Sequence, residues 1–120
     1  MLSLFSVIFL FLLQSILKKD QNNYYALVYL GAALLELGKT QQSLENYKKA
    51  TQVDPKNILA WQGIIKFYEK QGIKCHSDLL DAYKVVATHY EKYGFGFTEN
   101  HLILRYLSCV KILFTIYKSY

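Results

Sequence analysis

The sequence repeats itself with a period of 34 residues. Shifting the chain by this length brings identical residues into register, namely Asp20 with Asp54, Asn23 with Asn57, Ala26 with Ala60, and Gly38 with Gly72. A period of this length is typical of arrays of paired helices, in which each unit buries its apolar face against its neighbours. With 120 residues and a hydrophobic content of 52%, the chain is long enough for two such units and partial helices beside them.

Apolar residues at helical spacing predict an all-α fold of antiparallel helix pairs. The first pair is expected at residues 24–37 and 40–53, and the second at residues 58–71 and 77–93. Single residues mark the turns between these helices. Gly38 and Gly72 stand where each pair reverses direction, and Thr40 is a suitable N-cap for the helix after the first turn.

Pro55 marks the boundary between the two pairs. A proline inside a helix costs about 3 kcal/mol, so the first pair is expected to end before it. Asn57 can then cap the next helix, because its side-chain oxygen can accept a hydrogen bond from a backbone N–H of the first turn.

The residues that define the repeat either pack on one helical face or, at Pro55, end the unit. They are Leu27, Leu30, Gly31, Leu34, Tyr47, Ala50 and Pro55 in the first unit, and Trp61, Ile64 and Tyr68 in the second. Small residues at Gly31 and Ala50 allow the two helices to approach closely, and Tyr47 fills the wider gap beside them. Trp61 is interpreted as a core residue rather than a platform for a ligand.

This pattern resembles the tetratricopeptide repeat. Residues 24–57 follow it closely, and residues 58–93 follow it once two extra residues are allowed after the second turn. The departures are Leu27 and Leu34, which replace larger aromatics, and Ser43, which replaces an alanine. The resemblance implies a fragment of a right-handed superhelix, in which the first helix of each unit lines a protein-binding groove.

Groove residues are expected at the first-helix positions that packing does not use. They are Tyr25, Val28, Ala32, Leu35 and Glu36 in the first unit, and Leu59, Gln62, Lys66, Glu69 and Lys70 in the second. The apolar first set suits a protein segment or a neighbouring repeat. Tetratricopeptide modules that grip the C-terminal carboxylate of a chaperone use Lys and Asn where this chain has Val28 and Ala32, so such a clamp is disfavoured.

The reactive residues form no recognisable catalytic or metal-binding motif. His76, His89 and His101 are dispersed, and the metalloprotease, hydrolase and phosphate-loop motifs are missing from the sequence. We therefore expect neither an enzyme nor a bound cofactor. Cys75 and Cys109 lack a neighbouring cysteine and are expected to be separate, reduced thiols. The net charge of +5 comes from scattered Lys and Arg, which makes direct RNA contact a weaker hypothesis.

The two ends of the chain depart from the repeat. Residues 1–12 are an apolar segment with no repeat signal, whereas residues 13–23 fit the end of a preceding second helix and a turn. The apolar run of residues 1–17 is at the short limit for spanning a bilayer, so membrane contact there is an alternative interpretation.

Beyond residue 93, a turn is expected at the segment GFGF of residues 94–97, followed by an amphipathic helix that Thr98 or Asn100 would cap. The polar stripe of this helix consists of Arg105, Ser108, Lys111, Thr115 and Lys118, at spacings of three and four residues. Such a helix could cap the array or lie at a membrane surface.

Three segments within residues 13–93 resemble a more particular family. They are LKKDQNNYYALVYLGAALLEL, YKKATQVDPKNILAWQGIIKFYEKQG and DLLDAYKVVATHYE, and they are similar to the N-terminal region of the large tetratricopeptide scaffold of the superkiller complex. The resemblance implies a non-catalytic cytoplasmic scaffold that holds an RNA helicase and a β-propeller subunit, and it leaves an additional nuclear location open. Such a scaffold assists the exosome in degrading messenger RNA from the 3′ end.

Proteins of that family are much longer, so the resemblance also implies that this chain is a fragment or a truncated isoform. Two other functions stay open on the sequence alone: a membrane-anchored tetratricopeptide adaptor and a co-chaperone-like binding module.

Overall fold

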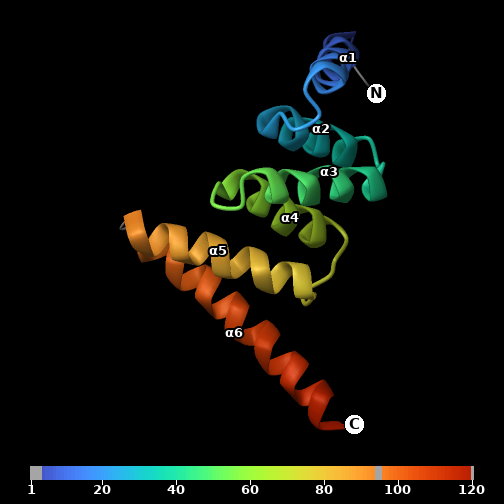
Figure 1. Ribbon diagram of the computed structural model, residues 1–120. Coiled ribbons are helices and arrows are strands. Elements are labelled where there is room, and N and C mark those ends of the chain that lie inside the picture. Colours follow the sequence, from blue (N-terminus) through green and yellow to red (C-terminus); the bar gives the residue numbers. More distant parts are fainter. Residues whose placement is uncertain (1–3, 94–95, 120) are drawn as a thin grey trace. The chain divides into compact units, whose positions relative to one another are not determined.

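The computed structural model describes residues 4–93 and 96–119 of the chain. Within these residues the chain forms six helices and no strand, which confirms the predicted all-α fold of packed helical hairpins. The helices are α1 (Leu4–Lys19), α2 (Tyr24–Glu36), α3 (Thr40–Val53), α4 (Ile58–Lys70), α5 (Ser77–Tyr93) and α6 (Gly96–Ser119) (Figure 1). The four helices of the two predicted pairs agree with the expected bounds to within one residue.

The chain divides into two compact units, residues 1–63 and residues 64–120, and the division falls inside α4. The N-terminal unit contains α1, α2, α3 and the first half of α4, and the C-terminal unit contains the second half of α4 with α5 and α6. The boundary between repeats near residue 57 and the right-handed superhelix remain predictions from the sequence pattern.

Asparagine side chains begin α2 and α4 in the same way. The Oδ1 atom of Asn23 accepts a hydrogen bond from the N–H of Ala26 at 3.0 Å, and Oδ1 of Asn57 accepts one from the N–H of Leu59 at 3.1 Å. The predicted cap at Asn57 is therefore confirmed. The predicted cap at Thr40 is wrong, because α3 already begins at Thr40 and is preceded by Lys39, which makes no side-chain capping bond.

Both hairpin turns use a glycine with a positive φ, 79° at Gly38 and 73° at Gly72. Beyond the first glycine, the N–H of Lys39 donates to the carbonyl of Leu34 at 2.9 Å. Beyond the second, the N–H of Ile73 donates to the carbonyl of Tyr68 at 3.0 Å. This is the Schellman arrangement, which satisfies carbonyls at a helix end and favours glycine, because other residues are strained at positive φ.

The ring of Tyr47 on α3 lies between two glycines of the N-terminal unit. A Cβ atom built on Gly31 of α2 would stand 3.0 Å from this ring, and one built on Gly63 of α4 would stand 2.3 Å from it. The ring is 2% exposed, and the adjacent Ala50 is completely buried. The two missing side chains therefore create the slot in which the tyrosine is buried.

Ser43, which stands where the repeat pattern has an alanine, makes a buried hydrogen bond between helices. Its side chain is completely buried, and its Oγ donates a hydrogen bond to the carbonyl of Gly31 at 2.6 Å. The hydroxyl thus links α3 to α2, whereas an alanine at this position would only fill space.

The inner face of α1 packs on α2. Buried Leu13 forms a cluster with Ala26, Leu30 and Leu34, and the partly buried Leu10 and Leu17 of α1 pack against this cluster. Ile16 does not belong to this cluster and is 41% exposed. Residues 1–3 of the apolar N-terminal segment lie outside the described residues.

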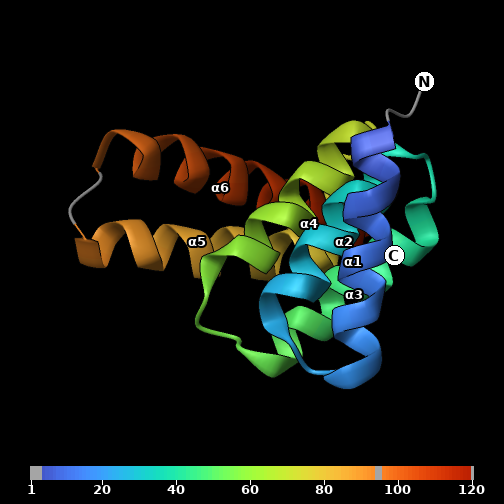
Figure 2. The ribbon, with the colours of Figure 1, turned by 90° about the horizontal axis from the view of Figure 1, so that it is seen from above.

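In the C-terminal unit, α6 runs back along α5 (Figure 2). The expected turn at residues 94–97 is wrong in its second half, because α6 already begins at Gly96; Gly94 and Phe95 lie outside the described residues. The start at Gly96 also places Thr98 and Asn100 inside the helix rather than at its cap.

Candidate functional site

The exposed face of α2 is narrower than the sequence predicts. Val28 and Leu35, both expected to line a groove, are only 7% and 2% exposed. The reason is that α2 packs against three neighbours: α1, α3 and the beginning of α4. Three neighbouring helices cover a wider arc of α2 than the one partner helix of an isolated hairpin would.

Four residues at helical spacing remain exposed along α2. They are Tyr25, Tyr29, Ala32 and Glu36, which we call the α2 face. Tyr25 is 53% and Tyr29 48% exposed, with Ala32 one turn further along. Tyr29 was missed in the sequence analysis, although its spacing of four residues from Tyr25 places both side chains on one side of the helix.

The tyrosine at the start of α2 joins this helix to α4 within the N-terminal unit. The N–H of Ala60 donates to the hydroxyl of Tyr24 at 2.9 Å, and this hydroxyl donates to the carbonyl of Asn57 at 3.2 Å. Burial raises the pKa of Tyr24, although the hydrogen bond from Ala60 opposes this effect. Tyr24 is therefore a structural link, and only its neighbour Tyr25 points to solvent.

The outer surface of α4 is polar along most of its length. Leu59 is exposed near its beginning and Gln62 is partly buried, whereas Lys66, Glu69 and Lys70 are exposed towards its end. That these residues of α4 line a protein-binding groove stays a prediction.

Trp61 is half-buried rather than part of the fully buried core. Its Nε1 donates a hydrogen bond to the carbonyl of Pro55 at 2.9 Å. An indole N–H requires a partner, and here the backbone of the turn before α4 supplies it. The indole thus fixes this turn, while Ile64 and Tyr68 are buried further along the helix.

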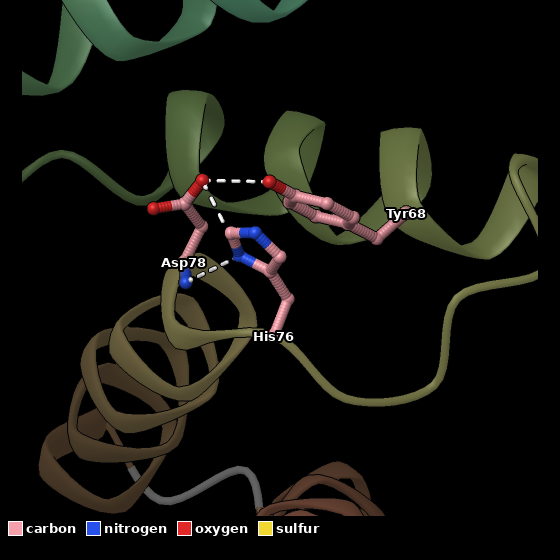
Figure 3. A network of polar contacts seen from close by, with 3 residues as sticks. All are labelled: Tyr68, His76 and Asp78. Atoms are coloured by element: carbon pink, nitrogen blue, oxygen red, sulfur yellow. Dashed lines mark hydrogen bonds and ion pairs between the residues drawn. The ribbon is translucent and has the colours of Figure 1, made fainter.

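A polar network holds the beginning of α5 against α4 (Figure 3). The hydroxyl of Tyr68 donates to Oδ2 of Asp78 at 2.6 Å, and the rings of Tyr68 and His76 stack with their centroids 4.7 Å apart. The N–H of Asp78 donates to Nδ1 of His76 at 3.1 Å. This bond requires an unprotonated Nδ1, so the contact of 3.6 Å between Nδ1 and Oδ2 becomes an ion pair only when the histidine is charged.

The network is built to fix a helix start rather than to move protons. Burial raises the pKa of Tyr68, and the hydrogen bond to Asp78 and its negative charge raise it further. The phenol therefore keeps its proton at neutral pH and acts as a fixed donor. The sequence analysis missed this grouping, although Tyr68 is ten residues from Asp78 and the two sit on either side of a predicted turn.

The two cysteines meet in the C-terminal unit. Cys75, in the loop between α4 and α5, forms a disulfide with Cys109 of α6, and their Cα atoms are 5.1 Å apart. The expectation of separate thiols is therefore wrong, because folding brings together residues that are 34 positions apart. Sequence spacing could not reveal this pair, since the return of α6 along α5 creates it.

A cleft of about 470 Å³ lies beside the disulfide and includes residues from α4, α5, α6 and the intervening loop. Its lining comprises Glu69, Gly72, Ile73, Lys74, Tyr83, Arg105 and Ser108. Arg105 forms an ion pair with Glu69, so the positive charge of its guanidinium is balanced by this carboxylate. Burial raises the pKa of Tyr83, while the positive charge of Arg105 acts in the opposite direction.

Within the residues that the structure describes, no group of three or more His, Cys, Asp or Glu side chains is placed to hold a metal ion. No helix within the same residues has both the length and the apolar character needed to cross a bilayer.

The chain is similar to known proteins over part of its length, while no protein-family model matches it. Human superkiller complex protein 3 is 39% identical over 79 residues, which are 65% of this chain and 5% of that protein. Tetratricopeptide repeat protein 37 of Xenopus laevis is 42% identical over 57 residues, 48% of this chain and 4% of that protein.

Superkiller protein 3 of Schizosaccharomyces pombe is 44% identical over 50 residues, 42% of this chain and 4% of that protein. The chain therefore spans about one twentieth of the length of these relatives. Over this part, the chain resembles proteins named for the superkiller complex and for the tetratricopeptide repeat.

Proposed function

We propose that this chain is a protein-binding scaffold segment of a superkiller-type complex, and that it assists exosome-mediated decay of messenger RNA from the 3′ end in the cytoplasm. The similarity over 79 residues to superkiller complex protein 3 carries this proposal. The helical hairpins support it, because such hairpins act by presenting surfaces to other proteins. An RNA helicase, a β-propeller subunit and exosome-linked factors are the proposed partners.

The α2 face is the contact surface that we propose for a partner in the N-terminal unit. Two exposed tyrosines offer flat apolar rings with hydroxyls at their edges, and such residues contribute strongly to protein interfaces. The small side chain of Ala32 leaves space beside the two rings, and Glu36 adds a negative charge. This surface suits a protein segment that carries apolar side chains.

We propose a non-catalytic role. The titratable side chains of Tyr68, His76 and Asp78 are engaged with one another and with the backbone at the start of α5. Tyr68 is only 4% exposed, so its hydroxyl is not accessible to a substrate.

Affinity capture from cells tests this proposal. The complete chain, tagged, is expected to recover superkiller subunits and exosome-linked proteins. Changing Tyr25→Ala together with Tyr29→Ala should reduce recovery at least about tenfold, since each buried interface aromatic contributes more than about 1 kcal/mol. A matched control is Lys49→Ala with Gln52→Ala, which alters two exposed residues of α3. Val28 is unsuitable as a probe, because it is buried and its replacement by a charge would disturb packing.

The outcomes separate the alternatives. Recovery of chaperones or of integral membrane proteins, unaffected by the tyrosine changes, would favour a general adaptor. If superkiller subunits are recovered equally well with either pair of changes, the proposed complex is supported, but its contact surface lies outside the α2 face.

A further inference from the structure

The second half of α6 is an exposed amphipathic surface. Large apolar side chains of this helix are between 38% and 59% exposed: Leu107, Val110, Ile112, Leu113, Phe114 and Ile116. The buried Cys109 marks where α6 is held to the rest of the C-terminal unit. Beyond it, side chains from Val110 to Ile116 are all exposed. Isolated exposed apolar residues are common, but a run of this kind indicates an interaction surface.

In the second half of α6, the polar side carries only positive charges. Residues 100–120 include Arg105, Lys111 and Lys118 and no Asp or Glu. Arg105 pairs with Glu69, which leaves Lys111 and Lys118 as the exposed cations of the second half. They are seven residues apart, so both lie on one side of the helix, with Thr115 between them.

Lys118 lies directly beside the apolar surface of α6. The Nζ atom of Lys118 lies over the Phe114 ring, 5.4 Å from its centroid, so the ammonium group is directly beside an exposed apolar side chain. A flexible lysine next to apolar side chains can keep its ammonium group at a polar boundary while those side chains enter an apolar phase.

A bilayer surface with anionic lipids is complementary to this arrangement. Protein interfaces usually surround an apolar centre with a rim of both charge signs, whereas the rim here is positive only. No described helix can cross a bilayer, so the helix would lie in the plane of the surface. α1 is also exposed and apolar, but its cations, Lys18 and Lys19, stand together at one end and form no polar side.

We propose that α6 is a binding site for membrane surfaces that contain anionic lipids. Leu113 and Phe114 enter the boundary between head groups and acyl chains, and Lys111 and Lys118 contact the lipid phosphates. The proposal does not depend on the function proposed above, because it uses only the surface of α6.

Co-sedimentation of the complete chain with lipid vesicles tests the proposal. The chain should bind vesicles of phosphatidylcholine containing phosphatidylserine, bind pure phosphatidylcholine much more weakly, and dissociate as salt increases. Lys111→Gln with Lys118→Gln should lower the partition coefficient about 30-fold, at about 1 kcal/mol for each lysine near the surface. Leu113→Ser with Phe114→Ser should lower binding by at least as much.

Two double variants remove the same charge elsewhere and serve as controls. Lys49→Gln with Lys56→Gln should leave binding within about threefold of the original chain, because these lysines are remote in sequence from α6. Lys18→Gln with Lys19→Gln tests α1. Circular dichroism should show unchanged helix content in each variant, which is expected for exposed positions.

Three results would overturn the proposal. The first is an absence of binding to the anionic vesicles, and the second is equal loss in all three lysine pairs, which would indicate unspecific attraction. The third is loss only in the Lys18 and Lys19 variant, which would place the membrane contact on α1. If the chain ignores vesicles but forms a dimer that Leu113→Ser and Phe114→Ser dissociate, the surface binds a second copy instead.

Discussion

The two hairpin turns of this chain begin alike and then differ. Gly38 and Gly72 adopt the same positive φ and are followed by the same hydrogen bond back to the preceding helix. After Gly38, α3 begins within two residues, whereas after Gly72 the chain continues through Ile73, Lys74, Cys75 and His76 before α5. The longer turn is held by a disulfide and by the network of Tyr68, His76 and Asp78.

This difference shows two ways of stabilising a helical hairpin. In the N-terminal unit, the ring of Tyr47 fits between Gly31 and Gly63, and the buried hydrogen bond from Ser43 to Gly31 adds to this packing. In the C-terminal unit, extra residues lengthen the turn, and specific polar and covalent contacts restrain it. The following changes separate these contributions.

The largest effect is expected from Tyr47→Ala. Removing a buried aromatic side chain from the slot between two glycines should lower the free energy of unfolding by about 3–5 kcal/mol. Urea denaturation followed by the fluorescence of Trp61, the only tryptophan, reports on the N-terminal unit. Tyr29→Ala is the control, because this side chain is 48% exposed. Equal losses for both changes would show that the slot does not stabilise the hairpin.

Cys75→Ser should have the next largest effect, and only in oxidising buffer. The disulfide closes a loop of 34 residues, for which the loss of chain entropy in the unfolded state corresponds to about 3–4 kcal/mol. Hydrogen exchange should show this loss in α5 and α6, and adding a thiol reductant to the original chain should reproduce it. Two thiols that react readily in the folded, oxidised chain would contradict the disulfide.

Alkaline pH should weaken the N-terminal unit through Tyr47. Burial raises the pKa of Tyr47 to about 12. Between the ordinary value near 10 and this value, the folded chain keeps a proton that the unfolded chain has lost. The contribution of Tyr47 is therefore complete below pH 10 and is lost as the pH rises towards 12, by up to about 2 kcal/mol. Urea midpoints of Tyr47→Phe should fall less steeply over this interval, and an identical fall would exclude Tyr47 as the group responsible.

The smallest effect is expected from Tyr68→Phe. This change removes the hydroxyl that donates to Asp78 but keeps the ring stacked on His76. A hydrogen bond to a carboxylate contributes about 1.5–3 kcal/mol, so the loss should lie near the lower limit, since Asp78 is partly accessible to water. Faster hydrogen exchange at the beginning of α5, with α2 and α3 unchanged, is the expected signature. Uniform acceleration across the chain would instead indicate a general packing defect.

The sequence by itself determined the features that depend on neighbouring residues. Helical periodicity located the four helices of the two pairs, the glycines located their turns, and Asn57 was recognised as a cap. Each of these depends on the backbone preferences of a few consecutive residues, which the sequence states directly.

Tertiary structure decided which surfaces are exposed and which distant residues meet. Val28 and Leu35 are buried because α2 has three packing neighbours, and periodicity does not reveal how many helices surround another. Gly63 meets Tyr47 only once α4 packs beside α3, and Cys75 meets Cys109 only once α6 returns along α5. The physical reason is that the width of a buried arc and the partners of a side chain depend on long-range packing, whereas helix and turn formation are local.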